Sequence, residues 1–220
     1  MVADTRISSL EGRNPRDEDQ KILRVPFGLL AGAGTRGMVR AIAERVSQHG
    51  MTPLDIPRLM RSYNDRATSD HPDLNGPMLY SLQNTHMISM TAEQAPSGGA
   101  DLRMYEYFPA GGGRFLGDEV GIGDVRIVGP TRRPELEALL ARCQREMIMP
   151  RPTPLERTTQ PDHLVDALTA NIRLAADAIV EIASFDNSVS PTFTIGVQYS
   201  AADVRISGPH DRAPAPAWLR

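Results

Sequence analysis

The sequence is poor in the residues on which several common chemistries depend. Cys143 is the only cysteine in 220 residues, so a disulfide within one chain and a metal site built from several cysteines are both excluded. Lys21 is the only lysine, which removes Schiff-base chemistry and the P-loop lysine unless Lys21 itself serves. Aromatic residues make up 5% of the chain, so the sequence offers few stacking platforms for nucleic-acid bases.

Catalytic and targeting motifs are also missing. The sequence contains no G-x-S-x-G, H-E-x-x-H or C-x-x-C motif, and its five histidines are scattered. We therefore expect a protein that is not an enzyme and that uses no cofactor and no metal. The first residues lack the basic-then-apolar order of a signal peptide, and no apolar run is long enough to cross a membrane. We expect an intracellular, cytoplasmic protein or a virion component, with no membrane partner.

What the sequence does contain is typical of a globular protein with a hydrophobic core. Hydrophobic residues make up 40% of the chain and charged residues 23%. The longest helical pattern covers residues 161–184, where apolar side chains recur at three- and four-residue steps. The polar stripe of this helix is narrow, so the helix is either central to its own domain or packed against a second copy. Its candidate self-association residues are Leu164, Leu168, Ile172 and Ile179.

The remaining patterns predict a mixture of helices and strands. Further helices are expected at 38–48, from 52 to about 65, and at 134–149, and strands at 101–108, 124–128, 192–199 and 203–207. The apolar stretch 21–30 is interrupted by Pro26, which argues against a central strand. We therefore predict an α+β fold with a mostly helical N-terminal half and a small antiparallel sheet in the C-terminal half. The alternative is a predominantly α-helical, coat-type fold.

The domain organisation follows from composition. We expect a polar N-terminal arm at 1–20, a single α+β domain at 21–207 that can be subdivided near residue 94, and an extended tail rich in proline and alanine at 208–220. One short sequence occurs twice, as DVRIVGP at 124–130 and DVRISGP at 203–209. It indicates either a duplicated unit or two edge strands of similar build, and the second interpretation is the simpler.

One glycine cluster matches a known motif over about twenty residues. Gly32, Gly34 and Gly37 lie in GAGTRG directly before a predicted helix, and this turn resembles the G-x-G-x-x-G fingerprint of dinucleotide-binding Rossmann enzymes. The resemblance implies a helix N-terminus that receives a phosphate-bearing nucleotide. The context departs from that family, because Pro26 interrupts the preceding strand and no second strand supplies an acid for the ribose. An enzyme that binds a nucleotide at 32–37 remains an alternative function.

Arginine supplies all the positive charge apart from Lys21, and it is concentrated in two stretches of the chain. Arginines are well suited to bidentate phosphate contacts, and the candidate nucleic-acid contacts are Arg36, Arg40, Arg126, Arg132, Arg133 and Arg205. We therefore expect a structural or assembly protein, such as a viral coat or RNA-coating subunit. Its expected partners are further copies of itself and RNA. A small regulatory or adaptor protein is a further alternative.

Overall fold

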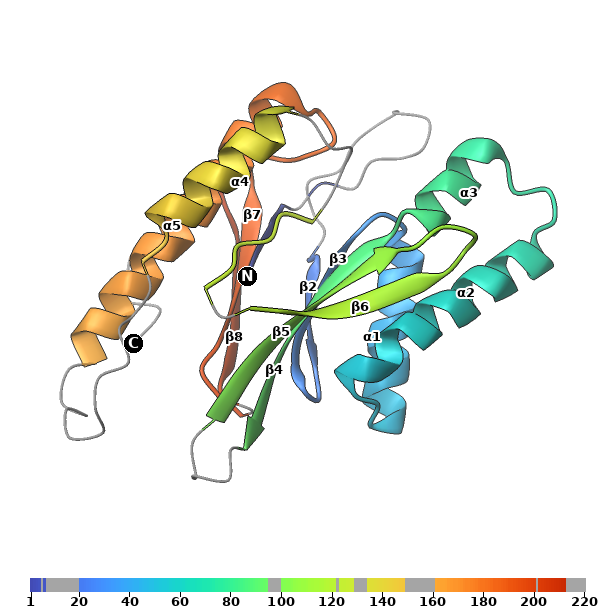
Figure 1. The fold of residues 1–220 in the computed structure, drawn as a ribbon, viewed down its shortest axis with the longest axis horizontal. Helices are drawn as coiled ribbons and strands as arrows, with labels where there is room; N and C mark the ends of the chain where they lie inside the picture. Colours follow the sequence, from blue (N-terminus) through green and yellow to red (C-terminus); the bar gives the residue numbers. More distant parts are fainter. Residues whose placement is uncertain are drawn as a thin grey trace.

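The computed structural model describes residues 1–4, 6, 20–94, 100–121, 123–128, 134–148, 161–200 and 202–212. Within these residues the chain forms two antiparallel β-sheets that pack face to face, with helices on the outer side of each sheet (Figure 1). The architecture is therefore α+β in four layers. No helix of the described part is long and apolar enough to span a membrane.

The larger sheet is built entirely from the first 120 residues. Its five strands follow one another in sequence order and every neighbouring pair is antiparallel. The strands are β2 (Ile22–Val25), β3 (Gly28–Ala33), β4 (His86–Gln94), β5 (Ala100–Pro109) and β6 (Phe115–Val120). Its outer face is covered by α1 (Arg36–His49), the short 3-10 helix η1 (Pro53–Asp55), α2 (Ile56–Asp70) and α3 (Gly76–Gln83).

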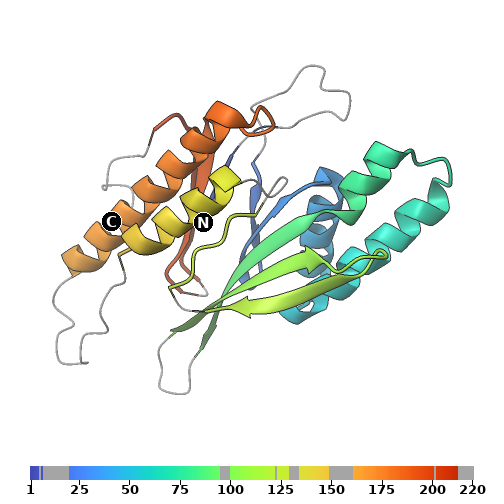
Figure 2. The same ribbon diagram turned by 45° about the horizontal axis from the view of Figure 1, so that its top comes forward.

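The smaller sheet joins the two ends of the described chain. Its strand order is β1-β7-β8, and Val2 of β1 pairs with Ile195 of β7. The strands are β1 (Val2–Asp4), β7 (Phe193–Gln198) and β8 (Val204–His210). Helix α5 (Pro161–Phe185) covers the outer face of this sheet, and α4 (Pro134–Glu146) lies beside α5 (Figure 2).

The alternation of side chains along β7 explains how the layers meet. Phe193, Ile195 and Val197 point outward and pack with Ile172 and Ala176 of α5 in one buried cluster. The opposite face of β7 meets the larger sheet, where Ile22, Leu29 and Ala31 form the core between the sheets with Val204 and Ile206 of β8. A Cβ atom at Gly196 would lie 2.9 Å from Ile22 and 3.0 Å from Leu29, so the absence of a side chain there permits the close approach of the two sheets.

The expected fold class is wrong in where it places the strands. Most of the N-terminal half is not helical, because it forms the five-stranded sheet, and the fold is not a helical coat fold. Pro26 does not break a strand; it lies in the tight turn between β2 and β3, where a missing N–H costs no ladder hydrogen bond. Gly111, Gly112 and Gly113 adopt positive φ angles in the turn that joins β5 to β6, so the glycine-rich stretch is a hairpin.

Several individual elements are confirmed. The predicted long helix is α5, the alternating stretch 192–199 is β7, and the helices expected at 38–48 and 134–149 are α1 and α4. The strand expected at 124–128 is wrong, since this segment has no regular secondary structure, whereas residues 204–209 of its repeat lie in β8. Residues 124–128 and their counterparts at 203–207 therefore have different structures. Of the tail expected at 208–220, residues 208–210 belong to β8, and residues 213–220 lie outside the described residues.

Candidate functional sites

The arginines predicted to bind nucleic acid do not gather on one surface. Arg36 and Arg40 are exposed on α1, outside the larger sheet, whereas Arg205 lies on β8 of the smaller sheet. Arg126 forms ion pairs with Glu106 at 3.2 Å and with Asp124 at 3.1 Å. Arg132 and Arg133 lie outside the described residues.

Arg205 has partners within its own sheet. Its guanidinium lies 3.3 Å from the Asp203 carboxylate, and it stacks over the Tyr199 ring at 5.2 Å from the ring centre. The described arginines of the set are thus distributed over α1, β8 and the segment that follows β6. A continuous phosphate-binding track through all of them is not formed by this chain alone.

The residues predicted to mediate self-association pack inside the chain's own core. Ile172 is buried, and Leu168 and Ile179 pack against the cluster formed by α5 and β7. The side chain of Leu164 lies outside the described residues. The narrow polar stripe of α5 therefore reflects its packing against the smaller sheet and α4.

The glycine turn at 32–37 is packed with protein atoms. A Cβ atom would lie 2.6 Å from Val39 at Gly32, 2.8 Å from Thr85 at Gly34, and 2.8 Å from Tyr63 at Gly37. The turn leads from β3 into α1, but β3 pairs with antiparallel neighbours on both sides, whereas the dinucleotide fingerprint belongs to a parallel βαβ unit. The three glycines are thus explained by close packing around the start of α1.

A polar cluster lies where the two sheets meet at the start of β2. The only lysine, Lys21, donates to both carboxylate oxygens of Asp4 at 2.9 Å, and the two side chains are 20% and 17% exposed. The same carboxylate accepts hydrogen bonds from the backbone N–H groups of Arg6 at 2.9 Å and Ser190 at 3.4 Å. Asp4 belongs to the smaller sheet and Lys21 leads into the larger one, so this ion pair joins the layers.

The loop between α5 and β7 contributes Ser190 to this cluster and carries further polar groups of its own. Asp186 is buried and accepts from the Ser188 hydroxyl at 2.6 Å, and the buried Ser190 hydroxyl lies 2.8 Å from that of Thr192. An ammonium has three donors, and among the described residues Asp4 provides the only acceptors for Lys21. The arrangement can therefore direct a positive charge at one further negative or carbonyl oxygen.

The second candidate site is the outer edge of β6, meaning the side of Phe115–Val120 that faces away from β5. No backbone hydrogen bond joins this edge to any other described residue. Its four central residues are exposed, among them Leu116 at 51%. Along its length β6 packs against α2 through Gly117, where a Cβ atom would lie 3.1 Å from Pro57. The strand is thus packed on α2, while its outer backbone groups have no partner in the described part of the chain.

The charge on the β6 edge is mainly negative. Asp118 and Glu119 are exposed, and Arg103 on β5 lies 3.8 Å from Glu119. Arg103 is already bound to Asp101 at 2.9 Å, and this hydrogen bond is the main reason why the pKa of Arg103 is above its ordinary value. Asp101, Arg103 and Glu119 line an open hollow of about 480 Å³ at the end of β6, together with residues 102, 120 and 121.

Sequence reasoning missed both sites for identifiable reasons. Lys21 stands out in the sequence as the sole lysine, but its partner Asp4 lies in a stretch whose composition predicts a polar arm. The sequence of β6 predicts a glycine-rich connection and not a strand, because its apolar residues do not alternate with polar ones. The signal that was available is the positive-φ preference of the glycines at 111–113, which is typical of a hairpin turn.

Comparison with known proteins leaves the family open. No protein-family model matches the chain, and no curated protein matches it. Among solved structures, the chain is similar to one titled Anbu (Gly-1) mutant from Hyphomicrobium sp. strain MC1, with 15% sequence identity and a TM-score of 0.47. The match covers 94% of this chain and 80% of that one. A likeness at this level carries no statement about activity or partners.

Proposed function

We propose that the chain is a structural subunit that self-associates through the open edge of its larger sheet. The observation that supports this is the β6 edge, where a strand packed on α2 leaves its outer N–H and C=O groups without partners among the described residues. An exposed sheet edge is a template for pairing with another chain. Backbone pairing of this kind supplies affinity, and flanking side chains select the partner.

The proposal is tested by light scattering during size-exclusion chromatography of the purified protein. We expect a mass above the 24.1 kDa of one chain, increasing with protein concentration. A mass of one chain at every concentration and at both low and high salt contradicts the proposal. The absorbance ratio of the same peak tests the expected RNA partner, which the distributed arginines do not by themselves support.

A second candidate function is catalysis at the Asp4–Lys21 cluster. The supporting observation is that the sole lysine is held largely buried by one carboxylate, with donor capacity left over. Asp4 connects this ammonium to the backbone of Ser190, whose side chain is buried. A fixed ammonium suits acyl transfer, because it stabilises negative charge that develops on a carbonyl oxygen. Since Lys21 is paired with a carboxylate, its role would be that of a cation and not of a base.

This second function is tested with fluorogenic peptide and ester substrates. Lys21→Met is expected to abolish hydrolysis, whereas Lys21→Arg retains the charge and part of the rate. Urea unfolding of both variants separates loss of the site from loss of the fold. Hydrolysis that is absent in the native protein, or unchanged in Lys21→Met, rules out catalysis at this cluster.

A further inference from the structure

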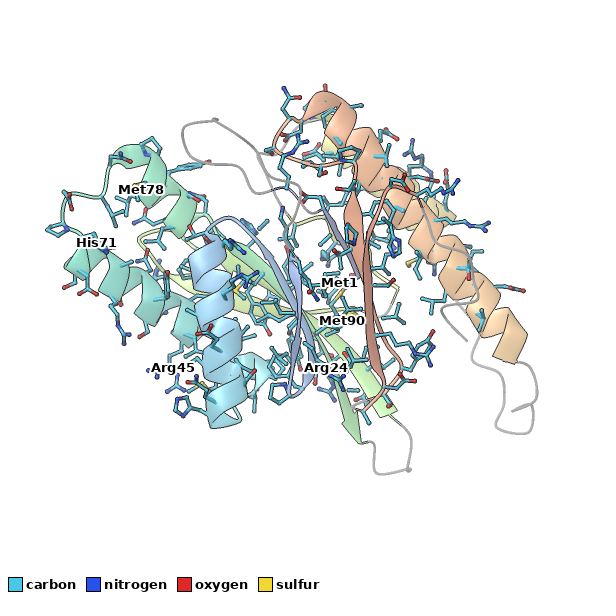
Figure 3. The ribbon with its side chains drawn as sticks, turned by 180° about the vertical axis from the view of Figure 1, so that it is seen from behind. Met1, Arg24, Arg45, His71, Met78 and Met90 are labelled. Atoms are coloured by element: carbon cyan, nitrogen blue, oxygen red, sulfur yellow. The ribbon has the colours of Figure 1, made fainter. Side chains whose placement is uncertain are left out.

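The open edge of β6 has a counterpart at the opposite end of the same sheet. The β2 edge, meaning the side of Ile22–Val25 that faces away from β3, also makes no backbone hydrogen bond to the other described residues. In the view of Figure 1 β6 lies in front, and from behind, in Figure 3, β2 and the labelled Arg24 come forward. One sheet therefore presents two open edges on opposite sides of the molecule.

The two edges carry opposite charge. Asp118 and Glu119 are exposed on β6, as described above. Arg24 is exposed on β2, where it donates to the Ala202 carbonyl at 3.4 Å and forms no ion pair with a described acid. The neighbouring Lys21 adds no net charge because Asp4 neutralises it. Counted over the described residues, the β2 edge is thus positive and the β6 edge negative.

The charge pattern disfavours pairing of two β6 edges. A two-fold axis between two copies of Phe115–Val120 would bring two pairs of acidic residues into the same short ladder. Like charges directly opposite each other on neighbouring strands are destabilising. The acids therefore repel an identical edge and admit a basic one, which is a form of partner selection.

The topology permits the opposite edges to join. Five strands that alternate in direction leave β2 and β6 running the same way, so a copy related by translation adds its β2 parallel to β6. Translation also preserves the faces of the sheet. Arg24 is paired with Leu29 of β3, so it lies on the face of the larger sheet that forms the core between the sheets. The registers from β3 to β6 are continuous, and they place Asp118 on that same face.

We infer that the β6 edge of one copy pairs with the β2 edge of the next copy, with Arg24 on the same face as Asp118. The occupant of the β6 edge is thus a second copy of this chain, joined head to tail. Such a contact is heterologous and leaves a free edge at each end, so it generates a ring if the rotation closes and a filament if it does not. This inference depends on the proposed self-association and specifies its geometry.

The test is a charge-reversal experiment read by light scattering. Arg24→Glu and the double variant Asp118→Lys/Glu119→Lys are each expected to weaken assembly by at least about tenfold, because each places like charges at the contact. An equimolar mixture of the two variants is expected to restore the mass, since every contact then joins opposite charges again. Circular dichroism and urea unfolding confirm that each variant keeps the fold.

The control has the same change of charge elsewhere. Glu44→Lys/Asp177→Lys alters exposed residues of α1 and α5 and is expected to assemble like the native protein. The head-to-tail pairing is overturned if either test variant assembles like the native protein. It is also overturned if both variants lose assembly and mixing them does not restore it. In both cases self-association itself still stands. A native protein that never exceeds the mass of one chain overturns both.

Discussion

Lys21 Nζ lies 2.9 Å from both carboxylate oxygens of Asp4, and this ion pair joins the two sheets. Asp4 ends the first strand of the smaller sheet, and Lys21 leads into the first strand of the larger one. Because both side chains are at least four-fifths buried, removing one partner leaves a charge that water solvates poorly. The pair thus makes the attachment of β1 sensitive to a single substitution.

Lys21→Met is expected to lower the free energy of unfolding by about 2–3 kcal/mol, because it leaves the Asp4 carboxylate buried without its cation. Asp4→Asn/Lys21→Met is expected to recover part of that loss, since neither charge remains. The matched control is Arg58→Met, which breaks the exposed Arg58–Asp55 pair and is expected to cost less than about 1 kcal/mol. Urea unfolding measures all three, and equal losses in Lys21→Met and Arg58→Met would show that burial does not matter here.

Gly117→Ala is expected to destabilise the fold by about 1–3 kcal/mol, because the new Cβ atom overpacks the contact between β6 and α2. It would lie 2.9 Å from the ring of Tyr107, which is buried and bonded to Ser89 at 2.7 Å and so cannot move away. Gly76→Ala at the start of α3 meets no atom within 4 Å and is expected to be neutral or stabilising. Thermal unfolding compares the two, and a neutral Gly117→Ala would contradict the packing of β6 on α2.

The stability is expected to fall as the pH rises above about 9. Burial raises the pKa of the Cys143 thiol above its ordinary value of 9.0, and burial also raises the pKa of the Tyr107 phenol. In the unfolded chain these two groups therefore lose their protons at a lower pH than in the folded chain. Their contribution to the free energy of unfolding is fully present below the pKa values of the unfolded chain and is lost as the pH rises through the pKa values of the folded chain. Urea unfolding at pH 7 and pH 10 measures the loss, and Cys143→Ala/Tyr107→Phe should reduce it. A loss of the same size in that variant would assign the effect to other groups.

The elements that the sequence predicts well are those whose periodicity is local. The spacing of Leu168, Ile172 and Ile179 predicts α5, and the alternation of Phe193, Ile195 and Val197 predicts β7, because the apolar face of each element packs in the same buried cluster. The five-stranded sheet is not predicted, because the proline and glycine residues in its turns are typical of interrupted strands and loops. Pro26 lies in one hairpin turn, and the glycines before β6 form another hairpin turn and not a flexible loop.

The sites depend on contacts between residues far apart in the chain. The pairing of Val2 with Ile195 brings the first residues beside the last strands, and no local sequence pattern predicts this pairing. Composition did single out Lys21, but only the paired strands place it against Asp4. The concentration of arginine in the sequence predicts phosphate contacts, whereas Arg126 and Arg205 form ion pairs with nearby acids. Charge counted along a sequence does not reveal such pairing.

Hydrogen exchange at two protein concentrations tests most directly the claim that the β6 edge mediates self-association. The account predicts that the outward-pointing backbone amides of Phe115–Val120 and Ile22–Val25 exchange at least about tenfold more slowly in the concentrated sample, because pairing protects these N–H groups. Strand β4, paired on both sides within one chain, serves as the internal reference. Exchange of the β6 amides that is independent of concentration, in a sample whose mass does increase, would contradict the account.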